Sequence, residues 1–295
     1  MKEKQDKDGE EEIKKQISVL RRIALAIFIV PMVIFIIIFI LLIKLKADTY
    51  EYDKRFGIFI GIDKKDINKL KPYKTIVIDA ANLKKSDIKK LKKSGKIVYT
   101  YLSIGSLEDY RTYYNKYKNL ALSEYEGWKG EYWVNVADKG WQKEMLKRAG
   151  EFKKKGVDGF FIDNTDVYYY HKKHGIYKGL ISILSGIKKM DTSLIINGGD
   201  EFVNKYIKEN RNLKKIADGV NQEDVFSMWD GVKTGKQDED VTKYYIDYLT
   251  KLSKSGTHIY LTEYVEEDEE LKAKIASYCK KRAWDYYISD DLVLD

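Results

Sequence analysis

The chain has 295 residues, a net charge of +8 and a composition that is 44% hydrophobic and 34% charged. This length suits one large domain or two ordinary ones, and the balance of apolar and charged residues excludes a disordered or fibrous chain. The single cysteine, Cys279, excludes an intramolecular disulfide and a cysteine-cluster zinc site, and three histidines leave little for a histidine-rich metal centre.

Residues 23–43 form an apolar run of 21 residues without a charge, and basic residues flank both of its ends. At about 1.5 Å per residue, a helix of this length spans roughly 30 Å, the thickness of a bilayer's hydrocarbon core. The run predicts a single transmembrane anchor, because the apolar part of a cleaved signal peptide is shorter, about 7–15 residues. Six Lys or Arg lie in residues 3–22, just before the anchor, and four lie in residues 44–63, just after it. This difference predicts a cytoplasmic tail at residues 1–22, an anchor in the cell membrane and an extracellular location for everything after the anchor.

After a short linker at residues 44–55, runs of β-branched and aromatic residues alternate with lysine-rich amphipathic stretches. This alternation is typical of repeated βα units. Nine strands are expected, at residues 56–62, 75–79, 96–103, 132–136, 157–163, 194–197, 219–222, 258–263 and 286–289. Helices are expected at residues 64–71, 86–94, 139–155, 166–189, 201–210, 239–255 and 267–281. Asp138 and Asp200 are candidate helix N-caps, since a carboxylate there accepts from free backbone N–H groups.

The expected fold class is α/β, with residues 56–295 forming a (β/α)8 TIM barrel after the anchor. About 250 residues is the usual size of such a barrel, and the first strand is followed by no glycine-rich dinucleotide motif. A barrel needs only eight strands, so one candidate must be peripheral, and residues 132–136 are the weakest. An open doubly wound sheet is the less favoured alternative.

The basic charge could indicate nucleic-acid binding, but the lysines are dispersed among amphipathic segments instead of gathered in a stripe. A solvated lysine-rich surface explains them better, and no nucleic-acid partner is expected. His171 and His174 have the spacing of one helix face, yet no third ligand accompanies them, so no metal and no cofactor is expected. Cys279 is interpreted as a small buried apolar residue.

Carboxylates and amides stand at the carboxyl ends of the expected strands, where a barrel places its active site. They are Asp79, Asp163 followed by Asn164, Asn197, Glu223 and Glu263. Taken singly, each could be a cap or a surface charge. Together they predict an acidic cleft, and paired carboxylates suit glycoside hydrolysis, in which one acid protonates the leaving oxygen and the other attacks or activates water.

Aromatic residues near the same rim favour a saccharide ligand, because flat rings pack against the apolar faces of sugars. The candidates are Tyr99, Tyr101, Tyr168, Tyr169, Trp229 and Tyr264.

Five ordered motifs resemble glycoside hydrolase family 114, which contains endo-α-1,4-polygalactosaminidases. They are the Tyr101–Ser106 segment followed by Tyr110 and Arg111, the Gly156–Asn164 segment, Asn197–Gly199, Asp218–Glu223 and Glu263–Tyr264. The resemblance spans about residues 56–289. It implies a TIM barrel that cleaves a polysaccharide containing α-1,4-linked galactosamine by a retaining mechanism with one Asp and one Glu.

By this resemblance, Asp163 is the nucleophile and Glu223 the general acid/base, although the pair is better defined than the two roles. Asp79, Tyr101, Asn197, Glu263 and Tyr264 would line the sugar subsite. A carboxylate near a protonated amine would favour a deacetylated amino sugar, a logic that fits Asp79 and Glu263. Residues 112–130 have no clear counterpart in the family, and their loops would help to shape the cleft. A non-catalytic surface carbohydrate-binding barrel and an assembly protein are the alternative functions.

Overall fold

The computed structural model describes residues 16–20, 32–33, 35–38, 54–229 and 233–294. The chain divides into two units, residues 1–51 and residues 52–295. In the first unit the described residues are helical and exposed. A search of the described residues finds no helix with the length and apolar character needed to cross a bilayer. Most of the predicted anchor, residues 23–43, and of the predicted linker lies outside the described residues.

The second unit is built on a parallel sheet of eight strands in the order β1-β2-β3-β7-β8-β9-β12-β13. The first and last strands contact each other, and Arg55 on β1 pairs with Asp285 on β13 at 3.0 Å, so the sheet curls into a nearly closed barrel. This agrees with the predicted (β/α)8 architecture. The strands are β1 Lys54–Phe59, β2 Tyr73–Ile78, β3 Ile97–Ser103, β7 Gly159–Asp163, β8 Ser193–Asn197, β9 Gly219–Glu223, β12 His258–Tyr264 and β13 Asp285–Ser289.

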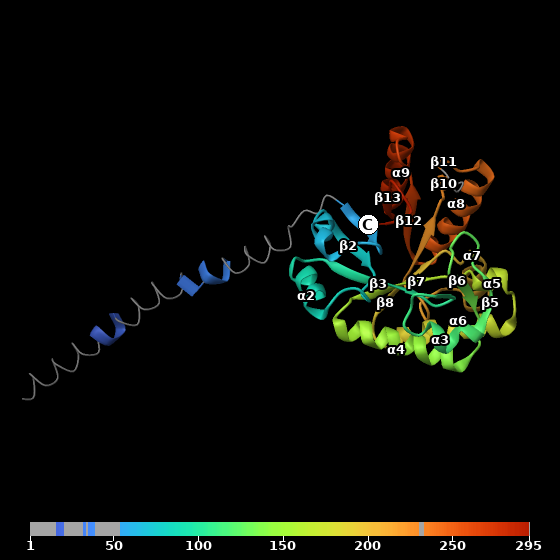
Figure 1. Cartoon of the computed structure of the whole chain (residues 1–295). Coiled ribbons are helices and arrows are strands. Elements are labelled where there is room, and N and C mark those ends of the chain that lie inside the picture. The colour runs from blue at the N-terminus through green and yellow to red at the C-terminus, as the bar shows by residue number, and fades with distance from the viewer. Residues whose placement is uncertain (1–15, 21–31, 34, 39–53, 230–232, 295) are drawn as a thin grey trace, which may run out of the picture. The chain divides into compact units, whose positions relative to one another are not determined.

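Helices surround the strands and form the outer layer of the barrel (Figure 1). They are η1 Lys64–Leu70, α2 Lys85–Lys93, α4 Lys139–Lys155, α5 Val167–Tyr170, α6 His174–Lys188, α7 Asp200–Asn210, α8 Glu239–Lys254 and α9 Glu269–Arg282. In α6, the residues Ile176, Leu180, Ile183, Leu184 and Ile187 recur at helical spacing and are fully or almost fully buried against the sheet. The strands are buried on both faces, which is why their sequences are apolar runs without strict alternation.

An insert between β3 and α4, residues 104–138, carries a second small sheet. Its three antiparallel strands, in the order β4-β6-β5, are β4 Ser106–Glu108, β5 Ala121–Glu124 and β6 Glu131–Val134. The insert also contains α3 Tyr114–Tyr117 and η2 Lys118–Leu120. The weakest of the nine expected strands, residues 132–136, is therefore the peripheral one, as predicted. A further hairpin, β10 Ser227–Trp229 and β11 Thr234–Lys236, follows β9.

Two local predictions were wrong. The expected helix at residues 166–189 is two helices, α5 and α6, with a break at His171, whose ring lies 3.0 Å from the Ser123 hydroxyl of the insert. His171 and His174 consequently do not share a helix face. Asp138 caps α4 as expected by accepting from the Trp141 N–H, but Asp200 is the first residue of α7, and the residue before it is glycine with a left-handed backbone.

Candidate active site

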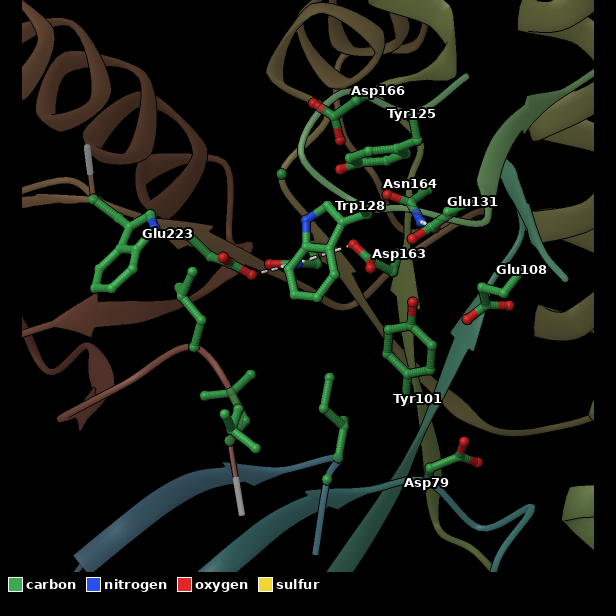
Figure 2. A pocket seen from close by; sticks show the side chains of 18 of the residues that line it. Asp79, Tyr101, Glu108, Tyr125, Trp128, Glu131, Asp163, Asn164, Asp166 and Glu223 are labelled. Carbon is green, nitrogen blue, oxygen red and sulfur yellow. Dashed lines mark hydrogen bonds between the residues drawn. The ribbon is translucent and has the colours of Figure 1, made fainter. Parts of the chain in front are cut away.

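Asp163, Asn197 and Glu223 are the last residues of three neighbouring strands, β7, β8 and β9. The parallel strands end on one rim, so the three side chains meet there. The Asn197 amide nitrogen Nδ2 donates to Asp163 Oδ1 at 3.0 Å and to Glu223 Oε1 at 2.7 Å. Because both oxygens are bound to one atom, they are no further apart than the sum of the two lengths, about 5.7 Å. Figure 2 shows the two carboxylates facing each other across the pocket.

A ladder of polar side chains inside the barrel holds Asn197 in place. Asn197 Oδ1 accepts from Asn221 Nδ2 at 2.7 Å, and Asn221 Oδ1 accepts from the Thr262 hydroxyl at 3.0 Å. Asn221 and Thr262 are fully buried. With its oxygen engaged by Asn221, the Asn197 amide can only turn its nitrogen to the carboxylates.

The two carboxylates differ in their electrostatic environments. Burial, followed by the charge of Asp163, raises the pKa of Glu223 to about 7. Burial also raises the pKa of Asp163, but hydrogen bonds from the Asn197 amide, the Asn164 backbone N–H and Tyr101 oppose that effect. With a pKa of about 7, Glu223 is protonated in about half of the molecules at neutral pH, whereas the site supplies more donors to the ionised form of Asp163.

Two of the predicted tyrosines take part in this arrangement. The Tyr264 hydroxyl donates to Glu223 Oε2 at 3.0 Å, and Tyr101 points from β3 towards Asp163 (Figure 2). Trp229 also lines the cavity, whereas Tyr99, Tyr168 and Tyr169 do not. Tyr99 is paired with Gly159 at the start of β7 and therefore lies too far down the barrel to reach the rim.

Asp79 lines the cavity, but its carboxylate already has a cationic partner. Arg111 Nη1 donates to Asp79 Oδ2 at 3.0 Å, and the same guanidinium binds Glu108 through Nε and Nη2, each at 2.9 Å. The prediction that Asp79 pairs with a substrate amine does not fit this geometry, because Asp79 already has an ion pair with Arg111.

Glu263 is placed away from the cavity, contrary to its predicted role in the sugar subsite. Its side chain is fully buried and accepts from the backbone N–H groups of Phe226 at 3.0 Å and Ser227 at 2.8 Å. These contacts anchor the turn between β9 and β10. Glu263 does not line the cavity and does not reach a ligand there. By holding the turn, it positions Glu223 and Trp229, which lie on either side of the turn.

The insert contributes residues that sequence reasoning did not identify. Glu131 on β6, together with Tyr125 and Trp128 from the turn before it, lines the cavity. Burial is the main cause that raises the pKa of Glu131 to about 7. Nothing in the local sequence marks Glu131, because only the packing of the small sheet brings it beside the barrel rim. The expectation that residues 112–130 shape the cleft agrees with the positions of Tyr125 and Trp128.

Asp166 and Asp224 are two further carboxylates of the cavity. Burial and then the charge of Asp163 raise the pKa of Asp166 to about 7, and burial raises that of Asp224 to about 6. Asp166 follows Asp163 by three residues and stands at the N-cap position of α5, so its sequence position is explained equally well by a helix cap. Asp224 directly follows Glu223, and this adjacency is the feature of the sequence that could have indicated its place in the cavity.

The cavity has a volume of about 780 Å³ and is strongly acidic. Its charged lining residues are Asp79, Glu108, Arg111, Lys129, Glu131, Asp163, Asp166, Glu223 and Asp224. An acidic cavity on a chain with a net charge of +8 attracts cationic ligands locally. Across the described part of the chain, no three His, Cys, Asp or Glu side chains are arranged to hold a metal ion.

The model of glycoside-hydrolase family GH114 matches residues 46–290. The chain belongs to this family. The match covers the whole barrel and confirms the resemblance seen in the motifs. The two facing carboxylates are thus those of a GH114 barrel, on the rim where a TIM barrel carries its active site.

Two relatives of this GH114 chain come from Methanocaldococcus jannaschii and Thermotoga maritima. An uncharacterized protein of Methanocaldococcus jannaschii is 30% identical over 197 residues, which are 61% of this chain and 56% of that protein. An uncharacterized protein of Thermotoga maritima is 23% identical over 218 residues, 68% of this chain and 64% of that protein. The chain thus covers less than two thirds of the length of either protein.

Two solved structures share the GH114 chain's fold. The glycoside hydrolase domain of PelA from Pseudomonas aeruginosa has a TM-score of 0.68 at 21% identity, covering 80% of this chain and 94% of that one. Aspergillus fumigatus Ega3, solved in complex with galactosamine, has a TM-score of 0.64 at 16% identity, covering 84% and 95% of the two chains. At these identities the likeness is one of fold.

Proposed function

We propose that this GH114 chain hydrolyses the glycosidic bonds of an α-1,4-linked polysaccharide that contains galactosamine, by a retaining mechanism. The single observation that carries the proposal is the Asn197 amide, which binds Asp163 and Glu223 at once. It keeps their nearest oxygens within about 5.7 Å, and retaining glycosidases have carboxyl groups about 5–5.5 Å apart, against roughly 6.5–9.5 Å in inverting ones. The shorter spacing leaves no room for a water between Asp163 and the sugar.

In the first step, Asp163 attacks the anomeric carbon and Glu223 gives its proton to the departing oxygen, so the C–O bond to the leaving sugar breaks as the bond to Asp163 forms. In the second step, Glu223 takes a proton from water, whose oxygen displaces Asp163. The raised pKa of Glu223 suits the first step. Glycosylation then removes the charge of Asp163, which lowers the pKa of Glu223 and suits it to act as a base.

The substrate class follows from the charge of the cavity. Most of its charged groups are carboxylates, and a deacetylated amino sugar carries an ammonium group at neutral pH. The galactosamine bound to Ega3, a protein of the same fold, supports the same class. Trp128, Trp229 and Tyr125 supply aromatic faces for the sugar rings.

A reducing-sugar assay on an α-1,4-galactosamine polymer tests the proposal. Wild type releases reducing ends, and both Asp163→Asn and Glu223→Gln lose at least about 10³-fold in kcat/KM, as expected for the loss of a nucleophile or its acid. The matched controls are Asp247→Asn on α8 and Glu270→Gln on α9, both exposed and outside the cavity. Equal rates in wild type and Asp163→Asn would refute hydrolysis by this pair, and binding without turnover on any glycan would support a carbohydrate-binding barrel instead.

We also propose that residues 23–43 anchor the barrel to the outer face of the cell membrane. The support is the uncharged run of 21 residues, with six Lys or Arg in residues 3–22 before it and four in residues 44–63 after it. The full chain should sediment with membranes after a high-salt wash, and protease added to intact cells should digest the barrel. Release of the full chain by salt would contradict an anchor, and complete protection of the barrel would contradict the orientation.

A further inference from the structure

Glu131 approaches the active site from the insert and uses only one of its carboxylate oxygens for anchoring. Oε1 accepts from the Ser106 hydroxyl and, at 3.1 Å, from the Asn164 side-chain amide. Among the described residues, the structure shows no partner for Oε2. The side chain is half-buried and lines the cavity, so the free oxygen belongs to a group that is oriented but still available.

Asp166 shows the same pattern on the other side of Asn164. Its Oδ1 accepts from the Gly199 backbone N–H at 3.1 Å, and within the described ranges Oδ2 has no hydrogen-bond partner. In the described structure neither Glu131 nor Asp166 forms an ion pair with Lys or Arg, in contrast to Asp79 and Glu108, which share Arg111. Two carboxylates without a counter-ion in one cavity favour the binding of a cation there.

Tyr125 supplies a flat ring, held in place by stacking, beside these two acids. Its ring stacks on Trp133 with centroids 4.3 Å apart, and Trp133 stacks on Tyr170 at 4.8 Å. In Figure 2, Asp166 and Tyr125 lie above Asp163, Glu131 lies above it and to the right, and Glu223 approaches from the left. Burial, followed by the charges of Asp163, Asp166, Glu131 and Glu223, raises the pKa of Tyr125. A flat ring bordered by acids matches a sugar that has an apolar face and an ammonium group.

The chemistry of a hexosamine places its amine beside the reacting carbon. Carbon C2, which bears the nitrogen, is bonded directly to the anomeric carbon C1 that Asp163 attacks. The amine of the attacked sugar therefore lies next to the groups that flank Asp163. We propose that Glu131, together with Asp166, binds the C2 ammonium of the sugar attacked by Asp163 and so selects a deacetylated residue at that subsite. This inference rests on the proposed hydrolase function, and it assigns a specificity role to the insert.

Binding measurements test this role without requiring turnover. The Glu223→Gln protein, which cannot protonate a leaving group, is titrated by calorimetry with a short α-1,4-galactosamine oligomer and with the same oligomer after chemical N-acetylation. Adding Glu131→Gln keeps an Oε1 acceptor for Ser106 and Asn164 but removes the charge. Glu124→Gln, at an exposed position on β5 of the same small sheet, is the matched control.

Glu131→Gln should raise the Kd of the galactosamine oligomer at least about tenfold and change that of the acetylated oligomer less than about twofold. Asp166→Asn should act in the same direction, and Glu124→Gln should change neither Kd. Equal weakening of both oligomers would mean that Glu131 acts through Asn164 on the geometry of Asp163, and the inference would be wrong. A protein that binds neither oligomer, or that shows no preference for the amine form, would overturn it as well. Failure of wild type to hydrolyse the polymer would instead count against the proposed function, whatever the binding selectivity.

Discussion

Replacing Asp163 by Asn should lower the pKa of Glu223. That pKa is about 7 because of burial first and the negative charge of Asp163 second. Asparagine keeps the size of the side chain and removes the charge, as formation of the glycosyl ester would. The variant therefore isolates the electrostatic change on which a switch of Glu223 from acid to base depends.

The magnitude follows from the spacing of the two carboxylates. Their nearest oxygens are at most about 5.7 Å apart, and two unit charges at this distance interact by roughly 3 kcal/mol at an effective dielectric constant of about 20. Since 1.36 kcal/mol corresponds to one pKa unit, Glu223 should titrate with a pKa of roughly 5 in Asp163→Asn. The direction is downward because removal of a neighbouring negative charge favours the ionised carboxylate.

Carboxyl-carbon NMR on protein labelled at the glutamate side chains measures this pKa directly, and the spectrum of Glu223→Gln identifies the resonance. Asp247→Asn, which removes an exposed acid from α8, should leave the pKa of Glu223 near 7. If Glu223 titrates at the same pH in wild type and Asp163→Asn, burial alone determines its pKa. Glycosylation of Asp163 could then not turn Glu223 into a base, and the electrostatic part of the mechanism would be refuted.

Four other variants have defined expected outcomes. Asn197→Ala removes the donor shared by both carboxylates, so kcat/KM should fall roughly 10–100-fold, the equivalent of one or two hydrogen bonds to a charged group at about 1.5 kcal/mol or more each. Because the Asn197 hydrogen bonds lower the pKa of both carboxylates, the pH–activity profile of this variant should move to higher pH. Glu263→Ala leaves the N–H groups at the β9–β10 turn without acceptors, which should cost about 2–4 kcal/mol of unfolding free energy and lower Tm by roughly 5–10 °C in a thermal melt. Gly105→Ala places a methyl group 1.7 Å from the backbone oxygen of Asn164, so it should abolish activity in the reducing-sugar assay. Gly150 lies inside α4 with open space around it, so Gly150→Ala should raise the free energy of unfolding of the protein by about 0.5–1 kcal/mol.

Each of these variants has a control or a contrary result. Asn115→Ala on α3 and Glu266→Ala after β12 remove exposed side chains outside the cavity and should leave activity and Tm unchanged. An unshifted pH profile in Asn197→Ala would mean that its amide does not tune the carboxylates. A Tm of Glu263→Ala equal to that of wild type would argue against its anchoring role. An active Gly105→Ala would show that the backbone after Asp163 can move.

Local sequence determined much of this fold. Eight apolar runs became the barrel strands within a few residues of their predicted bounds, because strands buried on both faces leave a clear composition signal. The residues that end β7, β8 and β9 could also be predicted to meet, since the carboxyl ends of parallel strands lie on one rim. These residues are Asp163, Asn197 and Glu223. The membrane anchor likewise rests on sequence, and it stays a prediction.

Tertiary structure decided which carboxylates can reach a ligand. Asp79 and Glu263 lie at the carboxyl ends of strands near the rim, yet Arg111 from the insert forms an ion pair with the first, and the second is buried in the core, where it holds the β9–β10 turn. Glu131 reaches the cavity although it ends no barrel strand. Strand periodicity records which way a side chain points within its own strand, but the partners that side chain meets come from segments distant in sequence. The charge and accessibility of these acids were therefore set only when the insert and the β9–β10 turn packed onto the barrel.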